Sequence, residues 1–421
     1  MKNFSAIILL FIANSISGIA QGISMIAIPW YFTAEGALEQ YGVIYVITSL
    51  ISLIWVPYSG TFIDRFNRKK IYMVVTLVCG SLLLSIALLG YYWGALPWYM
   101  VALVFMITFF NYNIHYPNLY AFIQEITEKE YYGKVTSYIE IQGQLSSVFA
   151  GACAAMLLVG SETGAINLFG WNIYLGIKIV PWSIYEIFLL DAGTYFVGFL
   201  IILLLKYQPI ALRTIEKGSL VTQLKIGFTY LQNNKEILLF GIASYSIFVA
   251  VLITTFFLAA PYVKNHLLAT GDVFAASEMY FALGAVFAGI AIRRVFKNLT
   301  TPMAVIIMTL ATFALFLVLG LSQNMWLFFA MMLVLGIANA GTRILRVTYL
   351  FSHIPNQVYG RAGSIFFLSH LILRVFFLSL FSLSFFHQGS NIVYAFGIMS
   401  LFLLLTAFVL IYYYRSFVPK T

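Results

Sequence analysis

The sequence predicts an all-α polytopic membrane protein with twelve transmembrane helices in two pseudo-symmetric six-helix bundles. Of its 421 residues, 62% are hydrophobic and 9% are charged, whereas soluble domains are roughly half apolar and about a quarter charged. Because a helix crosses the bilayer in roughly 20 residues, the apolar residues suffice for on the order of a dozen spans. A polar central segment and an internal repeat divide these spans into two halves.

Apolar windows separated by charged or Gly/Pro/Asn-rich breaks mark the individual spans. The charged segment 208–235 is predicted to be a cytoplasmic linker between an N-terminal bundle, residues 1–207, and a C-terminal bundle, residues 236–421. The predicted spans are residues 5–32, 41–62, 71–92, 97–122, 135–159, 187–207, 236–262, 275–296, 302–321, 325–350, 363–386 and 391–414.

Basic residues decide the orientation, because the cytoplasmic loops of membrane proteins carry an excess of Lys and Arg. With a cytoplasmic N-terminus, 18 of the 23 Lys and Arg residues lie on the inner side. We therefore expect a multi-pass protein of the bacterial cytoplasmic (inner) membrane with both termini in the cytoplasm. The net charge of +9 is then an orientation signal, and no nucleic-acid partner is expected. Trp and Tyr residues in the outer loop 160–186 are typical of an interfacial segment.

Sequence patterns of enzymes and metal proteins are absent from the chain. The two cysteines, Cys79 and Cys153, lie in apolar runs and support neither a disulfide framework nor a thiolate metal site. The sequence has no His-Glu-x-x-His, no Gly-x-Ser-x-Gly and no Gly-x-x-x-x-Gly-Lys-Ser/Thr pattern. We expect no catalytic residues, no metal site and no cofactor.

Two pairs of short segments repeat at an offset of about 227–229 residues. Tyr132–Lys134 follows span 4, and Tyr359–Arg361 follows span 10 with a similar sequence. Gly60–Arg68 follows span 2, and Gly289–Lys297 follows span 8. Matches at corresponding points of two six-span halves indicate a duplicated fold with a pseudo-two-fold axis along the membrane normal.

With its twelve spans, its central loop and the motif Gly60-x-x-x-Asp64-Arg65-x-x-Arg68-Lys69, the chain resembles the major facilitator superfamily over its whole length. Glu125-Ile-Thr-Glu128 and Leu190-Asp191-Ala192 look most similar to the macrolide-efflux and enterobactin-exporter branch of drug/proton antiporters. The resemblance implies transport by alternating access, driven by a proton gradient without a cofactor. It also implies that Gly60, Asp64, Arg65 and Arg68 act in gating; the alternative, a positive-inside anchor, suits Lys69 and Lys70 better.

The chain also departs from the family pattern. Asn67 stands where the loop motif usually has Gly, which is compatible with a left-handed backbone at that position. Ala150–Cys153 replaces the Gly-Pro pair that drug/proton antiporters often have in span 5. Span 4 lacks the Arg that many of them carry near its centre.

Polar residues inside the spans are the candidate substrate-binding groups, because burying them in a bilayer is costly. Span 1 carries Asn14, Ser17, Gln21 and Ser24 on one helical face. Spans 4 and 10 carry stripes of identical spacing that coincide in the repeat: Asn111, His115 and Asn118, and Asn339, Arg343 and Arg346. The resemblance implies that spans 1, 4, 7 and 10 line a central cavity. The alternatives are that Asn and Ser join neighbouring helices and that Arg343 extends to the cytoplasmic face.

Charged groups in spans 5 and 11 complete the candidate site. His370 and Arg374 lie one turn apart on span 11. The surplus of positive charge predicts a substrate with a carboxylate or phosphate group. For proton coupling we select Glu140 and His115, whose alternative is a static ion pair. His370, Asp191 and Glu278 are further candidate proton carriers, and Asp191 could instead be a helix N-cap.

The sequence therefore predicts a proton-coupled exporter of a small organic solute that is anionic and siderophore- or drug-like. The alternative is an importer of a carboxylate or siderophore-type solute with the same fold, because topology carries no direction. A membrane-embedded enzyme is less well supported. The expected partners are the small-molecule substrate and the lipid bilayer, and we expect a monomer.

Overall fold

The computed structural model describes residues 3–161, 165–168, 171–174, 176, 178–209 and 220–417. The chain forms two compact units. The first comprises Met1–Ala37 and Leu50–Glu216, and the second comprises Leu38–Ser49 and Lys217–Thr421. The helix that spans Leu38–Arg65 therefore contributes residues to both units.

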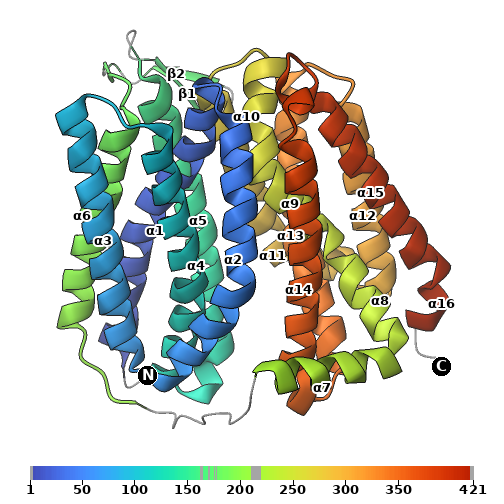
Figure 1. Cartoon of the computed structure of the whole chain (residues 1–421). Coiled ribbons are helices and arrows are strands. Elements are labelled where there is room, and N and C mark those ends of the chain that lie inside the picture. Colours follow the sequence, from blue (N-terminus) through green and yellow to red (C-terminus); the bar gives the residue numbers. More distant parts are fainter. Residues whose placement is uncertain are drawn as a thin grey trace. The chain divides into compact units, whose positions relative to one another are not determined.

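The first unit contains long helices and a small β-hairpin (Figure 1). The hairpin pairs its two strands antiparallel, with Ala165 opposite Tyr174, inside the loop for which an interfacial segment was predicted. The elements are α1 (Phe4–Ala34), α2 (Leu38–Arg65), α3 (Arg68–Trp93), α4 (Trp98–Ile126), η1 (Lys129–Tyr131), α5 (Tyr132–Val159), β1 (Ala165–Leu168), β2 (Trp171–Tyr174) and α6 (Ile184–Leu204).

The second unit follows the same plan with one span broken into pieces. Between Lys235 and His266 the chain stays helical but changes twice from α- to π-geometry, a change frequent at functional sites. The elements are α7 (Leu220–Asn233), α8 (Lys235–Ser244), α9 (Ser246–Ile253), η2 (Thr254–Leu258), α10 (Ala259–Pro261), η3 (Tyr262–His266), α11 (Gly271–Val295), α12 (Thr301–Leu319), α13 (Met325–His353), α14 (Asn356–Phe381), η4 (Ser384–His387), α15 (Ile392–Tyr412) and α16 (Tyr414–Phe417).

The predicted fold class is confirmed. Eleven helical segments are long and apolar enough to cross a membrane. The twelfth helix of spanning length is α4, whose 29 residues include the polar stripe of Asn111, His115 and Asn118. These polar residues lower the hydropathy of α4, so it is recognised by its length and its place in the repeat.

The start of α3 corrects the expectation for the loop motif. Asn67 has φ −65° and ψ 122°, which is an extended and not a left-handed conformation. Its side-chain oxygen accepts a hydrogen bond from the backbone nitrogen of Lys70 at 3.0 Å. Asn67 is therefore the N-cap of α3, a role for which Asn is among the best residues.

The start of α6 settles the N-cap alternative for Asp191. The N-cap is Ser183, whose backbone nitrogen donates to the Glu186 carboxylate at 2.7 Å in a capping box. Asp191 lies seven residues inside the helix and is fully buried.

Glycines bring α11 and α13 into backbone contact in the second unit. A Cβ atom on Gly284 would collide with the backbone of Leu333, and one on Gly336 would collide with the backbone of Phe281. Small residues at such crossings allow transmembrane helices to approach closely.

The central linker of the sequence prediction contains a helix. Its N-terminal part, 210–219, lies outside the described residues, but α7 follows and packs against α14 (Figure 1). Leu231 of α7 is fully buried, and the Tyr230 hydroxyl donates to the backbone oxygen of His353 at 3.1 Å. Gly227 lies directly on the backbone of Arg361, where a Cβ atom would not fit.

Replacing Gly227 by leucine is expected to displace α7 from α14, because the new side chain collides with backbone that cannot rotate away. Hydrogen exchange of the α7 amides should rise by roughly 5- to 150-fold, which corresponds to the 1–3 kcal/mol typical of overpacking. Phe228, which is about half exposed on the same helix, provides the control. Equal exchange in Gly227→Leu and Phe228→Leu would contradict the close contact.

Candidate functional site

The first unit brings together predicted site residues from α1 and α4. The Asn14 amide oxygen lies 2.7 Å from His115 Nε2, and the Tyr72 hydroxyl of α3 lies 3.1 Å from the same nitrogen. The Asn14 amide nitrogen donates to Gln142 of α5 at 2.8 Å. In this amide orientation the Asn14 oxygen accepts a hydrogen bond only from the His115 tautomer that carries its proton on Nε2. We call Asn14, Tyr72, His115 and Gln142 the His115 network.

Three other predicted residues of this unit contact neighbouring helices. The Asn111 amide donates to the Tyr195 hydroxyl at 2.9 Å, and the Asn118 amide donates to the backbone oxygen of Arg68 at 3.0 Å. Ser17 Oγ lies 3.4 Å from the backbone oxygen of Thr194. Both asparagines are buried. These contacts join α1 and α4 to α3 and α6.

Gln21 and Glu140 are both half-buried. Glu140 Oε1 accepts a hydrogen bond from the Tyr120 hydroxyl at 2.6 Å. The structure thus gives Glu140 and His115, the two groups selected for proton coupling, different hydrogen-bond partners.

The second unit gathers basic side chains around Tyr245 and Tyr45. The Arg346 guanidinium lies 3.6 Å above the Tyr245 ring, and its Nη1 donates to the backbone oxygen of Ser244 at 3.0 Å. The His370 ring stacks on Tyr245 at 5.2 Å with an angle of 15° between the planes. Arg374, one turn further along α14, lies with its guanidinium 5.7 Å from the Tyr45 ring, which belongs to the same unit.

We call Tyr45, Tyr245, Arg346, His370 and Arg374 the arginine cluster. Arg346, His370 and Arg374 are each only 5% exposed. Among the residues described, Arg346 forms no ion pair, and its guanidinium contacts Tyr245 and the Ser244 carbonyl. Of the remaining α13 stripe, Asn339 is half-buried and Arg343 is exposed.

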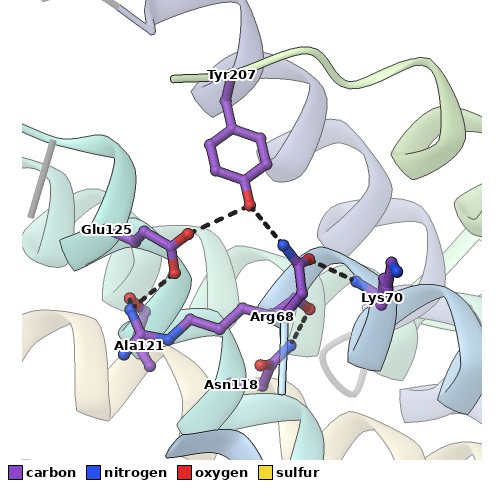
Figure 2. Close-up of polar contacts among 7 residues, drawn as sticks. Arg68, Lys70, Asn118, Ala121, Glu125 and Tyr207 are labelled. Atoms are coloured by element: carbon purple, nitrogen blue, oxygen red, sulfur yellow. Dashed lines mark hydrogen bonds and ion pairs between the residues drawn. The ribbon is translucent and has the colours of Figure 1, made fainter. Parts of the chain in front are cut away.

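The loop motif forms a third set of contacts, at the predicted cytoplasmic end of the first unit (Figure 2). Arg68 Nη1 lies 3.2 Å from Glu125 Oε2 and donates to the backbone oxygen of Ala121 at 2.6 Å. The Tyr207 hydroxyl donates to Glu125 Oε1 at 3.2 Å. Arg68 at the start of α3 is thereby fixed to the end of α4. We call Arg68, Glu125 and Tyr207 the Arg68 network.

The structure gives no comparable network of contacts for the described parts of the other predicted gating residues. Arg65 is exposed, and a Cβ atom on Gly60 would meet open space. The Asp64 side chain lies outside the described part of the structure.

The residues that sequence reasoning missed are the partners of the charged groups. Nothing in the sequence marks Tyr45 and Tyr245 as site residues, because aromatic residues make up 18% of the chain. Glu125 and Asp191 were noted as parts of a family pattern, but the sequence does not show that they are buried.

Comparison with known proteins identifies the fold. The model of the Major Facilitator Superfamily matches residues 10–378. A mutant of the nucleoside transporter NupG is 14% identical, with 96% of this chain and 99% of that chain covered and a TM-score of 0.72. A D-xylose–proton symporter is 14% identical, with 100% and 99% covered and a TM-score of 0.71. A bacterial homologue of the iron transporter ferroportin is 12% identical, with 98% and 99% covered and a TM-score of 0.67. No curated protein sequence matches the chain.

Proposed function

Because the chain belongs to the major facilitator superfamily and is a multi-pass membrane transporter rather than an enzyme, we propose that it exports a small organic anion in exchange for protons. The substrate is siderophore- or drug-like and crosses the bacterial cytoplasmic membrane by alternating access. Both termini lie in the cytoplasm, as the distribution of basic residues predicts.

The arginine cluster carries the substrate proposal. A guanidinium has five N–H donors, and one of those of Arg346 is bonded to the Ser244 carbonyl. The remaining edge suits the two oxygens of a carboxylate or phosphate, with which Arg forms bidentate pairs. The Tyr245 ring stabilises the cation without neutralising it. A bound anion would supply the missing negative charge to a site that is otherwise expensive to bury.

The remaining predicted polar residues are proposed to contact the substrate as well. We assign Asn14, Ser17, Gln21, Asn111, His115 and Asn118 to the first unit, and Asn339 and Arg343 to the second. Several of them also hold helices together, so their substitution should affect both binding and stability.

Proton coupling and export are supported by the resemblance to drug/proton antiporters and by the titratable groups of the first unit. Glu140 and His115 are the coupling residues on this proposal. Import of a similar solute remains the competing direction, because alternating access is reversible.

The Arg68 network is proposed to be the latch that the loop motif implies. It links the start of α3 to the end of α4 through two hydrogen-bonded groups of opposite charge. Gly60, Asp64 and Arg65 would complete the gating segment.

The test uses purified protein in proteoliposomes with an imposed pH gradient. The probes are a fluorescent long-chain carboxylic acid and its uncharged methyl ester. We expect saturable, gradient-driven transport of the acid and none of the ester. Equal saturable transport of both would overturn the anion proposal, and transport of the acid that ignores the gradient would overturn proton coupling. Inverted membrane vesicles decide the direction, since only an exporter fills them when their lumen is acidic.

A further inference from the structure

A carboxyl group lies in the middle of α6 with almost no polar surroundings. Asp191 is 0% exposed, and its Oδ2 accepts a hydrogen bond from Ser24 Oγ of α1 at 2.8 Å. Its other oxygen, Oδ1, has no hydrogen-bond partner among the described residues. Asp191 lies seven residues after the first residue of α6, which is about 10 Å along the helix axis. It is therefore far from the water that would hydrate the end of the span.

The groups that face Asp191 from every packed helix are uncharged. α1 contributes Ser24, α3 contributes the Cys79 thiol, and α6 itself contributes the Tyr195 hydroxyl one turn away. Tyr195 is in turn hydrogen-bonded to Asn111 of α4. Within the described part of the chain, no Lys, Arg or His side chain forms an ion pair with Asp191.

An ionised carboxylate in such a place is strongly disfavoured. Transfer of an unpaired carboxylate into a medium of low dielectric constant costs tens of kcal/mol in the Born limit, and in practice the group takes up a proton. A single hydrogen bond from Ser24 offsets only a few kcal/mol of that cost. The buried environment therefore favours the neutral, protonated form of Asp191.

A polar face of α1 connects Asp191 with the His115 network. Ser24 lies on the same face as Gln21, Ser17 and Asn14, at intervals of three and four residues. Ser24 and Asn14 are ten residues apart, which is about 15 Å along the helix. At one end of this face is Asp191 and at the other is His115.

We propose that Asp191 is the proton-binding site of the first unit and that the polar face of α1 links it with the His115 network. This inference rests on the proposed proton coupling and adds to it a residue that was not selected from the sequence. In a coupled cycle, the proton leaves the Asp191 carboxyl only when α1 or α3 moves away from α6 and water or a cation reaches the carboxylate.

The close packing of α6 against α1 and α3 links the protonation of Asp191 to the positions of these helices. A Cβ atom on Gly80 of α3 would meet Tyr195 of α6 at 2.8 Å, and one on Gly198 of α6 would meet Ser17 of α1 at 3.0 Å. Because the three helices touch so closely, hydration of Asp191 requires their separation. Proton occupancy therefore depends on the position of α1.

The first measurement detects the proton itself. Infrared difference spectra of the purified full-length protein should contain the carbonyl stretch of a neutral carboxylic acid at neutral pH, and Asp191→Asn should remove it. Ser24→Ala should shift the band, since it deletes the hydrogen bond that Ser24 donates to the carboxyl, and this second variant serves if Asp191→Asn does not fold. Glu278→Gln is the control and should retain the Asp191 band. A spectrum that is unchanged by both Asp191→Asn and Ser24→Ala overturns the inference.

The second measurement tests coupling. In proteoliposomes carrying the fluorescent long-chain acid, the rates with and without a pH gradient should become equal in Asp191→Asn. A variant that retains the wild-type ratio of the two rates overturns the coupling role. If the wild-type protein itself shows no gradient-driven transport while the Asp191 band is present, proton coupling fails and the protonated carboxyl is retained as a structural group.

Discussion

Arg346→Ala is expected to lower the transport rate of an anionic solute by roughly 10- to 150-fold, which corresponds to the 1.5–3 kcal/mol of a hydrogen bond to a charged group. The guanidinium of Arg346 is held in place by the Tyr245 ring and the Ser244 carbonyl, so it faces a ligand with little loss of side-chain entropy. Initial rates of the fluorescent acid in proteoliposomes measure the loss.

Arg346→Lys separates charge from shape. Lysine keeps the positive charge but has neither the planar stack on Tyr245 nor the bidentate edge, so it should recover only part of the rate. Arg415→Ala, at an exposed arginine of α16, should transport at the wild-type rate. Full activity of Arg346→Ala would contradict an anion site at this arginine.

Arg68→Ala is expected to cause the largest loss of stability. Removal of one partner from a buried ion pair costs about 3–5 kcal/mol, because the other charge is left without compensation. Glu125 is only 4% exposed at its side chain, while Arg68 is 14% exposed, so the lower end of this range is appropriate. Thermal unfolding of the detergent-solubilised protein should report a clear fall in Tm.

A double-mutant cycle identifies the source of that loss. The variant with both Arg68→Ala and Glu125→Gln should be less destabilised than the sum of the two single variants, because the second change removes the negative charge that Arg68 no longer balances. Lys70→Ala, at an exposed neighbour, is the control and should unfold at the wild-type temperature. Additive effects of the two single variants would show that the ion pair contributes nothing.

The spans were predictable because each is set by hydrophobicity over about 20 residues. α11 was expected at 275–296 and is Gly271–Val295. α7 was missed since it is a short amphipathic helix in a charged segment, where polar residues dominate the composition. The change to π-geometry at Thr254 leaves the apolar pattern intact, so the sequence predicted the span but not its interruption.

The sequence predicted only those residues of the candidate site that are charged or polar within otherwise apolar spans. Arg346, His370 and Arg374 could be selected because charges inside spans are rare. Tyr245 could not be selected, because the chain has many aromatic residues and the sequence does not show which side chains Tyr245 contacts. Asp191 was visible as a residue, but its burial depends on three helices that meet only in the folded chain.

The glycine contacts between α11 and α13 fix more than the distance between two helices. Because the backbones touch at Gly284 and Gly336, α13 cannot rotate by one residue without driving a side chain into α11. Arg346 lies ten residues beyond Gly336, about 15 Å along the same rigid axis. The direction in which this cation faces is therefore set by two residues that carry neither a charge nor a side chain.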